Sequence, residues 1–460
     1  MLTSEDLEAA LEISPPGFIR KTVFKGISID SRTLTPGDVF FAIQGPRFDG
    51  HSFLKEARGK GAVAFVVNRS AVSDADLSGY ENVFPVSDTT RALGQVSNYY
   101  RRQRSVRSIA VTGSAGKTTT KEFCHLLLSK RYSVHATSGN LNNQFGLPLT
   151  VFRLKPEHQI LLAEMGASRS GDIAYLCGIA EPDIGIVTNV YPAHLEGFGS
   201  LGKVYDAKLE LGAAVAKRNG TLIVNGDDEE LVRRAKKFGV RLLTFGRMPG
   251  NDFRMTDVAR TGEAVCFRVN QRDFFEIPTP AVFNADNFLA AMALAVEMEI
   301  SSEDIREALK AFRPVAGRFE IRDLRNGVRV VYDAYNANPG AVLRSLESFS
   351  ALRGDRGRMI AVLGDMKELG PESCLLHREV GRSLKRFGLD ALLSVGPESG
   401  AIAEGARREN ACGEIRHFPN NEEVRLFLSS FAKEGDMIFL KGSRSMKLEE
   451  VLDGLEACGL

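Results

Sequence analysis

Apolar runs of strand length alternate with helix-patterned stretches through the middle of the chain. The runs "SIAVTG", "QILLAEMG", "DIGIVTNV" and "TLIVNG" lie between about residues 107 and 312. Such alternation is typical of a parallel sheet with helices on its faces. A strand-rich stretch, "AVCFRVNQRDFFEI", precedes the helix-patterned "NADNFLAAMALAVEM". We therefore expect a central α/β domain over residues 86–312.

The two ends of the chain carry smaller patterns of the same kind. Before residue 85, strand-like pieces such as "DVFFAI" and "AVAFVV" are separated by the turn-forming "TPGD" and "PRFDGH". From about residue 313 the alternation restarts with "VRVVYDAY", "MIAVLGDM", "ALLSVG" and "DMIFLKGS", although none of the following loops has the GxGxxG dinucleotide fingerprint. The prediction is an α/β protein of three domains: a small N-terminal α/β domain (1–85), a central P-loop ATPase-like parallel-sheet domain (86–312) and a C-terminal Rossmann-like domain (313–460).

Composition and charge exclude several classes of protein. Charged residues make up 25% of the 460 residues and hydrophobic residues 43%, and the net charge of +1 gives no footprint for nucleic acid or a membrane surface. No segment approaches the roughly 18 apolar residues of a membrane span, and the N-terminus lacks the pattern of a signal peptide. Six scattered cysteines without a CxxC pair suit thiols kept reduced. We expect a cytoplasmic monomer that binds neither nucleic acid nor membrane.

The stretch "IAVTGSAGKTTT" joins a strand, a glycine loop and a helix. Only two residues separate Gly113 from Gly116, and Val111 stands where the usual P-loop spacing has its first glycine. The free N–H groups and dipole of a helix N-terminus favour an anion there, Lys117 adds a point charge, and the Thr118 hydroxyl can ligate Mg²⁺. The alternative, an incidental glycine turn, is disfavoured by the strand and helix on either side. The residues expected to bind phosphate are Gly113, Ser114, Ala115, Gly116, Lys117, Thr118 and Thr119.

Two further loops follow strands on the same side of the predicted sheet. Glu164 ends the strand "LLAEMG", at the carboxyl edge where α/β sheets place ligand groups, so its carboxylate could hold a metal. "TNVYPAHLEGFGS" follows another strand and carries Asn189 and His194. Alone, such a glutamate is more often a solvated edge residue and such a histidine a packed one. The nearby phosphate loop favours ligand roles, and the lack of an NKxD motif favours ATP over GTP.

Together these stretches resemble the Mur ligases, ATP-dependent amide-bond ligases of peptidoglycan precursor synthesis. The shortened loop "TGSAGKTT" is that family's form of the phosphate cradle, and the resemblance covers essentially the whole chain. "YNANP", "LGDMKELG" and "KGSRSMK" resemble the members that add D-Ala-D-Ala to UDP-N-acetylmuramoyl-tripeptide, whereas the DNPR motif of the diamino-acid-adding members is absent. The resemblance implies these two molecules as substrates, with ATP and Mg²⁺ as cofactors.

The resemblance also assigns roles in the central domain, residue by residue. Lys117 and Thr118 would hold the ATP phosphates and Mg²⁺, and Glu164 and His194 would be metal ligands. Lys208, in "DAKLEL", matches a lysine that is carbamylated in much of the family and would be a further metal ligand. Without the resemblance, Lys208 would read as a solvated helical lysine.

In the C-terminal domain, Arg318 of "GRFE" would reach phosphate and Asp333 of "YDAY" the ribose. The implied catalytic residues are Lys117, Lys208, His194 and Arg318. Without the resemblance, Arg318 would read as an interdomain ion-pair residue and Asp333 as a strand-end carboxylate.

The adenine pocket departs from the family pattern. Gly-x-His-Asn is common before the helix that ends the central domain, but this chain reads "AVFNADN", with Ala281 and Phe283 in place of glycine and histidine. Asn284 and Asn287 remain at the spacing that faces adenine in the family.

The candidate substrate-binding residues follow from matching stretches. They are Ser31, Arg32, Asp49, Gly50, His51, Asn140, Asn143, Ser168, Asn336, Asn338, Ser443 and Arg444, the last four for the incoming dipeptide. Turn structure would equally explain the N-terminal residues, and a helix cap would explain "NANP". Two other functions remain open: another amide ligase of the superfamily, such as a folylpolyglutamate synthase, and a non-catalytic ATP-binding scaffold.

Overall fold

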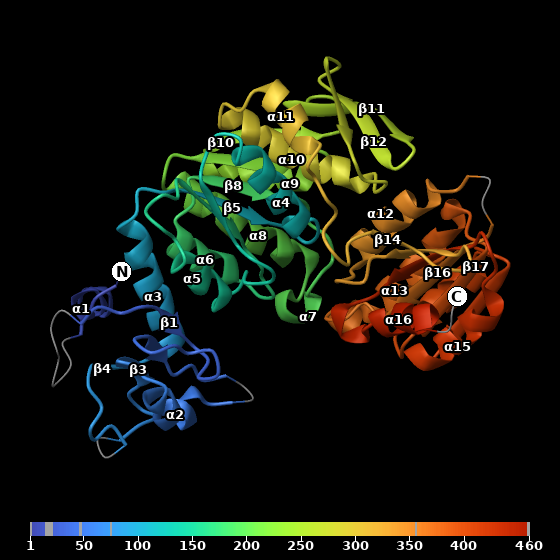
Figure 1. Ribbon diagram of the computed structural model, residues 1–460. Coiled ribbons are helices and arrows are strands. Elements are labelled where there is room, and N and C mark those ends of the chain that lie inside the picture. The colour runs from blue at the N-terminus through green and yellow to red at the C-terminus, as the bar shows by residue number, and fades with distance from the viewer. Residues whose placement is uncertain (1, 14–21, 46–47, 74–75, 355–356, 458–460) are drawn as a thin grey trace.

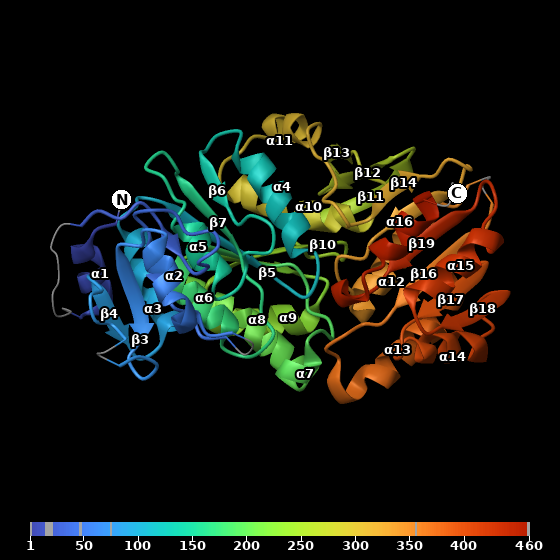
Figure 2. The ribbon, with the colours of Figure 1, turned by 60° about the horizontal axis from the view of Figure 1, so that its bottom comes forward.

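Three sheets, each covered by helices, divide the protein into three parts (Figure 1). The computed structural model describes residues 2–13, 22–45, 48–73, 76–354 and 357–457. Both views place the N-terminal and C-terminal domains on opposite sides of the central domain (Figures 1 and 2). The predicted three-domain α/β fold is confirmed.

The N-terminal domain contains a four-stranded parallel sheet of order β1-β2-β3-β4. Its strands are β1 (Ile27–Ser28), β2 (Val39–Phe41), β3 (Ala64–Asn68) and β4 (Val83–Val86), and its helices are α1 (Ser4–Leu11), η1 (Gly50–Phe53) and α2 (Leu54–Gly59). Helix α3 (Thr89–Arg102) leads from this sheet into the central domain. The side chain of Asp88 caps α3, and Arg101 and Arg102 near its other end pair with Glu181 of the central domain.

The central domain contains a nine-stranded sheet of order β13-β12-β11-β10-β9-β8-β5-β7-β6. Strands β5, β7, β8 and β9 are buried almost throughout, because helices cover both faces of this parallel part. In the antiparallel part, β12 and β13 alternate between buried and more exposed positions, as expected for a sheet with one solvated face. The strands are β5 (Arg107–Thr112), β6 (Val134–Ala136), β7 (Ile160–Glu164), β8 (Ile184–Val187), β9 (Thr221–Asn225), β10 (Arg241–Gly246), β11 (Phe253–Thr261), β12 (Ala264–Val269) and β13 (Asp273–Ile277).

The helices of the central domain place its functional loops. Helix α4 begins at Lys117 directly after the phosphate loop, and α10 packs against it. The helices are α4 (Lys117–Leu128), α5 (Gly146–Val151), α6 (Asp172–Ala180), α7 (Leu195–Phe198), α8 (Leu201–Ala216), α9 (Glu229–Ala235), η2 (Lys236–Phe238), α10 (Phe283–Glu297) and α11 (Ser302–Leu309).

The C-terminal domain is a second doubly wound unit, with sheet order β14-β15-β19-β16-β17-β18. Only the edge strand β14 is antiparallel to its neighbour. The strands are β14 (Glu320–Asp323), β15 (Arg329–Tyr332), β16 (Met359–Gly364), β17 (Ala391–Val395), β18 (Glu414–Phe418) and β19 (Met437–Lys441). The helices are α12 (Pro339–Ser350), η3 (Gly370–Glu372), α13 (Ser373–Ser383), η4 (Leu384–Phe387), α14 (Gly400–Arg408), α15 (Asn421–Phe431), η5 (Arg444–Met446) and α16 (Glu449–Ala457).

The C-terminal domain touches the central domain through hydrogen bonds and ion pairs at several places. The backbone N–H of Glu196 donates to the carbonyl of Glu368 at 3.1 Å, and Arg260 on β11 donates to the carbonyl of Ala351 at 3.0 Å. These contacts join α7 and β11 of the central domain to the C-terminal domain. None of the helices in the described ranges is long and apolar enough to cross a membrane.

Candidate active site

A cavity of about 1390 Å³ lies between the central and C-terminal domains and reaches the first turn of α3. Most of the residues predicted to bind ATP or metal line it. These are Ser114, Ala115, Gly116, Lys117, Thr118, Thr119, Glu164, His194, Asn287, Arg318 and Asp333. Of the predicted substrate-binding residues, Asn140, Asn143, Ser168, Asn336 and Asn338 line the same cavity.

The phosphate loop needs its two glycines for both conformation and space. Gly113 and Gly116 have φ angles of 148° and 79°, which disfavour residues with a side chain. A Cβ on Gly113 would lie 2.0 Å from the Thr188 hydroxyl, and one on Gly116 would lie 2.3 Å from Oδ1 of Asn287. The Nζ of Lys117 donates to the carbonyl of Gly113 at 2.9 Å, which holds the charge across the loop.

The loop after β8 braces the phosphate loop from one side. The Asn189 side chain accepts from the N–H of Ala115 at 2.9 Å and donates to its carbonyl at 3.0 Å. The Ser114 hydroxyl donates to the carbonyl of Tyr191 and accepts from its N–H. Asn189 is thus anchored to the loop backbone. The supporting role of Tyr191 has no signal in the sequence alone.

Glu164 has the surroundings expected of a cation ligand. It lies at the end of β7 with 2% of its surface exposed, and its Oε1 accepts from the Asn142 side chain at 2.7 Å. Its other oxygen, Oε2, is buried and has no hydrogen-bond partner within the described part of the chain. An unsatisfied buried carboxylate oxygen is costly, and a bound cation would satisfy it. The residues present therefore fit a Mg²⁺ ion.

The other oxygen donors suit a metal held partly by substrate. The described ranges contain no group of three histidine, cysteine, aspartate or glutamate side chains that could hold a metal ion without help. Mg²⁺ is commonly bound by one or two carboxylates together with phosphate oxygens and water. Thr118 borders the same cavity, and its hydroxyl accepts from Nη2 of Arg318 at 2.9 Å.

His194 links the central domain to the C-terminal domain. The residue has a φ of 52° and precedes α7, and its Nδ1 contacts a carboxylate oxygen of Glu368. This contact holds the pKa of Glu368 below its usual range, since the imidazole stabilises the carboxylate. His194 lines the same cavity as the phosphate loop, and its role as a metal ligand stays a prediction.

Lys208 is buried in α8, with 2% of its surface exposed, so its reading as a solvated helical lysine is wrong. Burial, and then the charge of Lys117, lower its pKa to about 7. Its ammonium lies over the Phe198 ring, 5.6 Å from the centroid, and no carboxylate of the described residues forms an ion pair with it. Lys208 itself lies outside the cavity lining.

Two predicted residues of the C-terminal domain reach the cavity in different ways. Arg318 bonds to Thr118 at the phosphate loop, and its guanidinium lies over the Tyr335 ring at 4.4 Å from the centroid. Asp333 is buried and accepts from Nζ of Lys441 at 2.6 Å and from a serine hydroxyl. The structure thus puts Arg318 beside the phosphate loop, while the Asp333 carboxylate is engaged inside its own domain.

The four candidates for the dipeptide divide into two pairs. Asn338 caps α12 and donates to the carbonyl of Ser114 at 3.4 Å, and Asn336 lies beside it in the cavity lining. Ser443 and Arg444 lie outside that lining. The Ser443 hydroxyl accepts from a backbone N–H, and Arg444 pairs with Glu449 at 3.2 Å.

The predicted N-terminal residues lie outside the cavity lining, which begins at Asp88. The imidazole of His51 is buried: Nδ1 lies 2.6 Å from Oδ1 of Asp49, and Nε2 accepts from a backbone N–H at 2.8 Å. A Cβ on Gly50 would clash with a neighbouring backbone at 2.7 Å. Ser31 is buried, and Arg32 pairs with a nearby aspartate. The part of the cavity that faces the N-terminal domain is lined instead by Asp88, Thr90 and Arg91. The sequence did not predict these three residues as part of the site.

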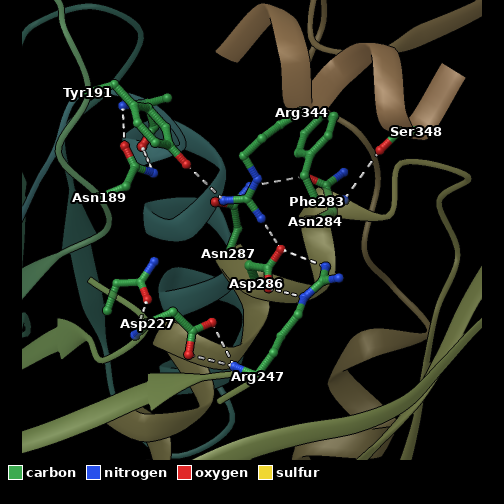
Figure 3. A network of polar contacts seen from close by, with 12 residues as sticks. Asn189, Tyr191, Asp227, Arg247, Phe283, Asn284, Asp286, Asn287, Arg344 and Ser348 are labelled. Atoms are coloured by element: carbon green, nitrogen blue, oxygen red, sulfur yellow. Dashed lines mark hydrogen bonds and ion pairs between the residues drawn. The ribbon is translucent and has the colours of Figure 1, made fainter. Parts of the chain in front are cut away.

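A charged network joins α10, α12 and the segment after β10 (Figure 3). Asp286 receives two bonds from Arg247, at 3.1 and 3.0 Å, and an ion pair from Arg344 of the C-terminal domain. Beside it, Asn287 donates to Asn284 at 3.2 Å, and only Asn287 of these two lines the cavity. The residues of this network come from three separate segments and two domains. No sequence pattern therefore predicted that they would meet.

Comparisons with known proteins agree along nearly the whole chain. Family models match residues 23–101 (Mur ligase family, catalytic domain), 111–295 (Mur ligase middle domain) and 317–444 (Mur ligase, glutamate ligase domain). The chain is 34% identical over 437 residues, 95% of this chain and 94% of the relative, to the UDP-N-acetylmuramoyl-tripeptide--D-alanyl-D-alanine ligase of Bacillus subtilis. It is 35% identical to the Escherichia coli protein of the same name, with 94% of both chains covered.

Solved structures are similar over the same extent. A crystal structure of MurF from Acinetobacter baumannii has a TM-score of 0.87 at 30% identity and covers 99% of this chain and 98% of that one. A MurF ligase from Thermotoga maritima in complex with ADP has a TM-score of 0.82 at 30% identity, with 95% of this chain and 99% of that one covered.

Proposed function

The chain belongs to the Mur ligase family, and from that premise we propose that it joins D-Ala-D-Ala to UDP-N-acetylmuramoyl-tripeptide at the expense of ATP. The observation that carries the proposal is the shared cavity, where the phosphate loop, Glu164 and Arg318 meet. Both relatives named above carry this ligase name over nearly their full length. A cavity of about 1390 Å³ has room for a nucleotide and a peptide together.

The chain's own residues support an acyl-phosphate route. A peptide carboxylate is a poor electrophile, so one of its oxygens first attacks the γ-phosphorus of ATP, and the bond to the β-phosphate oxygen breaks to release ADP. Lys117 and Arg318 lie where their charges can offset the negative charge of this transfer. The neutral amine of the dipeptide then attacks the acyl carbon, phosphate leaves with the transferred oxygen, and the nitrogen of the new amide releases one proton.

Mg²⁺ fits the oxygen donors on the cavity wall. Glu164 and the Thr118 hydroxyl would hold it, with His194 as a further ligand, and when bound it supplies positive charge to the phosphates. The side chain of Asn142 fixes one oxygen of Glu164, which leaves the other free to face the ion.

Lys208 would join this set after reaction with CO₂. Only the neutral amine forms a carbamate, and a pKa of about 7 keeps a large share of Lys208 neutral at physiological pH. The amine nitrogen bonds to the carbon of CO₂ and releases a proton, which leaves an anionic oxygen ligand in place of the positive charge beside Lys117. We expect the carbamate to bind a second Mg²⁺, and it would also remove the repulsion between the two lysines.

We further propose that the protein works as a cytoplasmic monomer. The five cysteines among the described residues are free thiols, in keeping with a reducing compartment.

A phosphate-release assay tests the function. Release should require ATP, Mg²⁺, D-Ala-D-Ala and a UDP-linked tripeptide with either diaminopimelate or lysine as its third residue. Release stimulated by a folate with glutamate would favour the folylpolyglutamate synthase alternative. Nucleotide binding without turnover on any of these substrates would favour a scaffold.

A further inference from the structure

The cavity extends from the phosphate loop toward two ends, and only one of them suits a nucleotide base. The end near α3 is lined by Thr90, Arg91 and other polar residues, and it faces the N-terminal domain. The other end is lined by Phe283, which is aromatic, and by Asn287, which has an amide side chain. A purine needs a flat apolar contact together with an amide that can donate and accept hydrogen bonds, so this second end suits the base.

This base end is continuous with the phosphate loop. The Asn287 side chain lies directly against Gly116, where even a Cβ would come within 2.3 Å of its Oδ1. A nucleotide whose phosphates lie on the loop therefore reaches Asn287 and Phe283 without crossing the cavity. The lining on the C-terminal side of this end includes Ala341 and Arg344 of α12.

Arg344 is held in one orientation from two sides (Figure 3). Its guanidinium forms an ion pair with Asp286, whose side chain is only 11% exposed, and it donates to the Tyr191 hydroxyl at 3.3 Å. Tyr191 in turn is bonded to Ser114 of the phosphate loop. The side chain of Arg344 is therefore fixed relative to the loop, although it comes from the other domain.

Arg344 could contact either the phosphates or the base of a nucleotide. Its ion pair with Asp286 decides between these two roles. Lys117 has no carboxylate ion-pair partner in the described part of the chain, so its charge is available to a phosphate. The charge of Arg344 is instead paired with the carboxylate of Asp286. Arg344 nevertheless lines the cavity, and a guanidinium whose charge is matched can still stack its flat face on an aromatic ring. A purine is such a ring.

We propose that Arg344 is the positioning residue that the C-terminal domain gives to the nucleotide-base subsite, where its guanidinium forms a wall against the base. Phe283, which stands where the family commonly has histidine, and Asn287 form the other walls. Asp286 holds Arg344 in place. The inference rests on the proposed function only in taking ATP as the nucleotide.

The test compares Arg344→Met with Arg247→Met by calorimetry in the presence of Mg²⁺. Both arginines pair with Asp286, but Arg247 lies outside the cavity lining and belongs to the central domain. We expect Arg344→Met to weaken ADP binding about tenfold while binding of inorganic tripolyphosphate, which has no base, stays unchanged. Arg247→Met should bind both ligands like the unaltered protein. The KM for ATP should rise in Arg344→Met with the KM for the UDP-linked peptide unaltered.

Three results would overturn the proposal. Unchanged ADP binding in Arg344→Met would exclude a contact with the base. An equal loss of tripolyphosphate binding in Arg344→Met would make Arg344 a phosphate ligand. An equal loss of ADP binding in Arg247→Met would mean that both arginines only stabilise the fold around Asp286. Arg344→Lys, which keeps the charge but loses the flat face, should show the same loss of ADP binding and replaces Arg344→Met if that variant does not fold. ADP binding needs no peptide substrate, so failure to use D-Ala-D-Ala would count only against the proposed function.

Discussion

Replacing Lys208 by methionine should make the protein more stable and nearly inactive. Burial and the charge of Lys117 lower the pKa of Lys208 to about 7 from the ordinary 10.5. Between these two values the unfolded chain holds a proton on this lysine that the folded protein has released. The unfolded state binds more protons there, so the contribution of Lys208 to stability is unfavourable near pH 7 and improves as the pH rises toward 10.5.

The size of the effect follows from the same two values. The gap between 10.5 and 7 corresponds to about 5 kcal/mol at about 1.4 kcal/mol per pH unit. This is an upper bound, because a buried lysine can gain some relief by local rearrangement. Methionine is also a long unbranched side chain but has no charge. We expect Lys208→Met to raise the free energy of unfolding by a few kcal/mol at pH 7, and by less at pH 9.

Urea unfolding at pH 7 and pH 9 in CO₂-free buffer measures the stability, and ligase turnover measures the activity. Short carboxylic acids should partly restore turnover in Lys208→Ala by supplying the missing oxygens, and ¹³C-bicarbonate should give a carbamate signal only when Lys208 is present. Lys203→Met is the matched control, since Lys203 is exposed on the same helix. Full activity of Lys208→Met, or a stability that depends on pH as in the unaltered protein, would refute the reasoning.

Two further substitutions test the phosphate loop and the domain contact. Lys117→Ala should lower kcat at least about a hundredfold, since it removes the charge that faces the transferring phosphoryl group, and near-normal turnover would contradict the loop's role. Gly340→Ala would place a Cβ 2.4 Å from the Tyr191 ring, and overpacking of about 1–3 kcal/mol should weaken the domain contact and raise the KM for ATP. Gly178→Ala is the control, since Gly178 is exposed on α6 and a Cβ there would have no atom within 4 Å. This alanine should stabilise the protein by about 0.5–1 kcal/mol and leave the KM for ATP unchanged. Equal effects of Gly340→Ala and Gly178→Ala on this KM would contradict the steric argument.

The fold could be predicted from the sequence because its signals are local. Buried parallel strands appear as continuous apolar runs, and the phosphate loop is a short contiguous stretch between a strand and a helix. Glu164 and His194 could be found because Glu164 ends a strand and His194 lies on the loop after another, both at the carboxyl edge of the sheet. These residues line one cavity in the structure.

The remaining features depend on packing between segments that are far apart in sequence. Lys208 is buried by the elements that pack around α8, so the sequence of this helix alone predicts a solvent-exposed lysine. The pairing of Asp286 with Arg344 requires two domains to meet. The short motif that contains Ser443 and Arg444 was matched by resemblance, but the turn after β19 keeps both residues out of the cavity lining. Sequence motifs indicated the reaction better than they indicated which side chains face it.

The central claim is that the peptide carboxylate is activated as an acyl phosphate, and isotope transfer tests it most directly. UDP-N-acetylmuramoyl-tripeptide with ¹⁸O in its reacting carboxylate is turned over with ATP and D-Ala-D-Ala, and the products are analysed by mass spectrometry. The account predicts one ¹⁸O atom in each released phosphate and the other in the carbonyl of the new amide. Phosphate free of ¹⁸O would mean that water attacks ATP directly, and it would contradict the account.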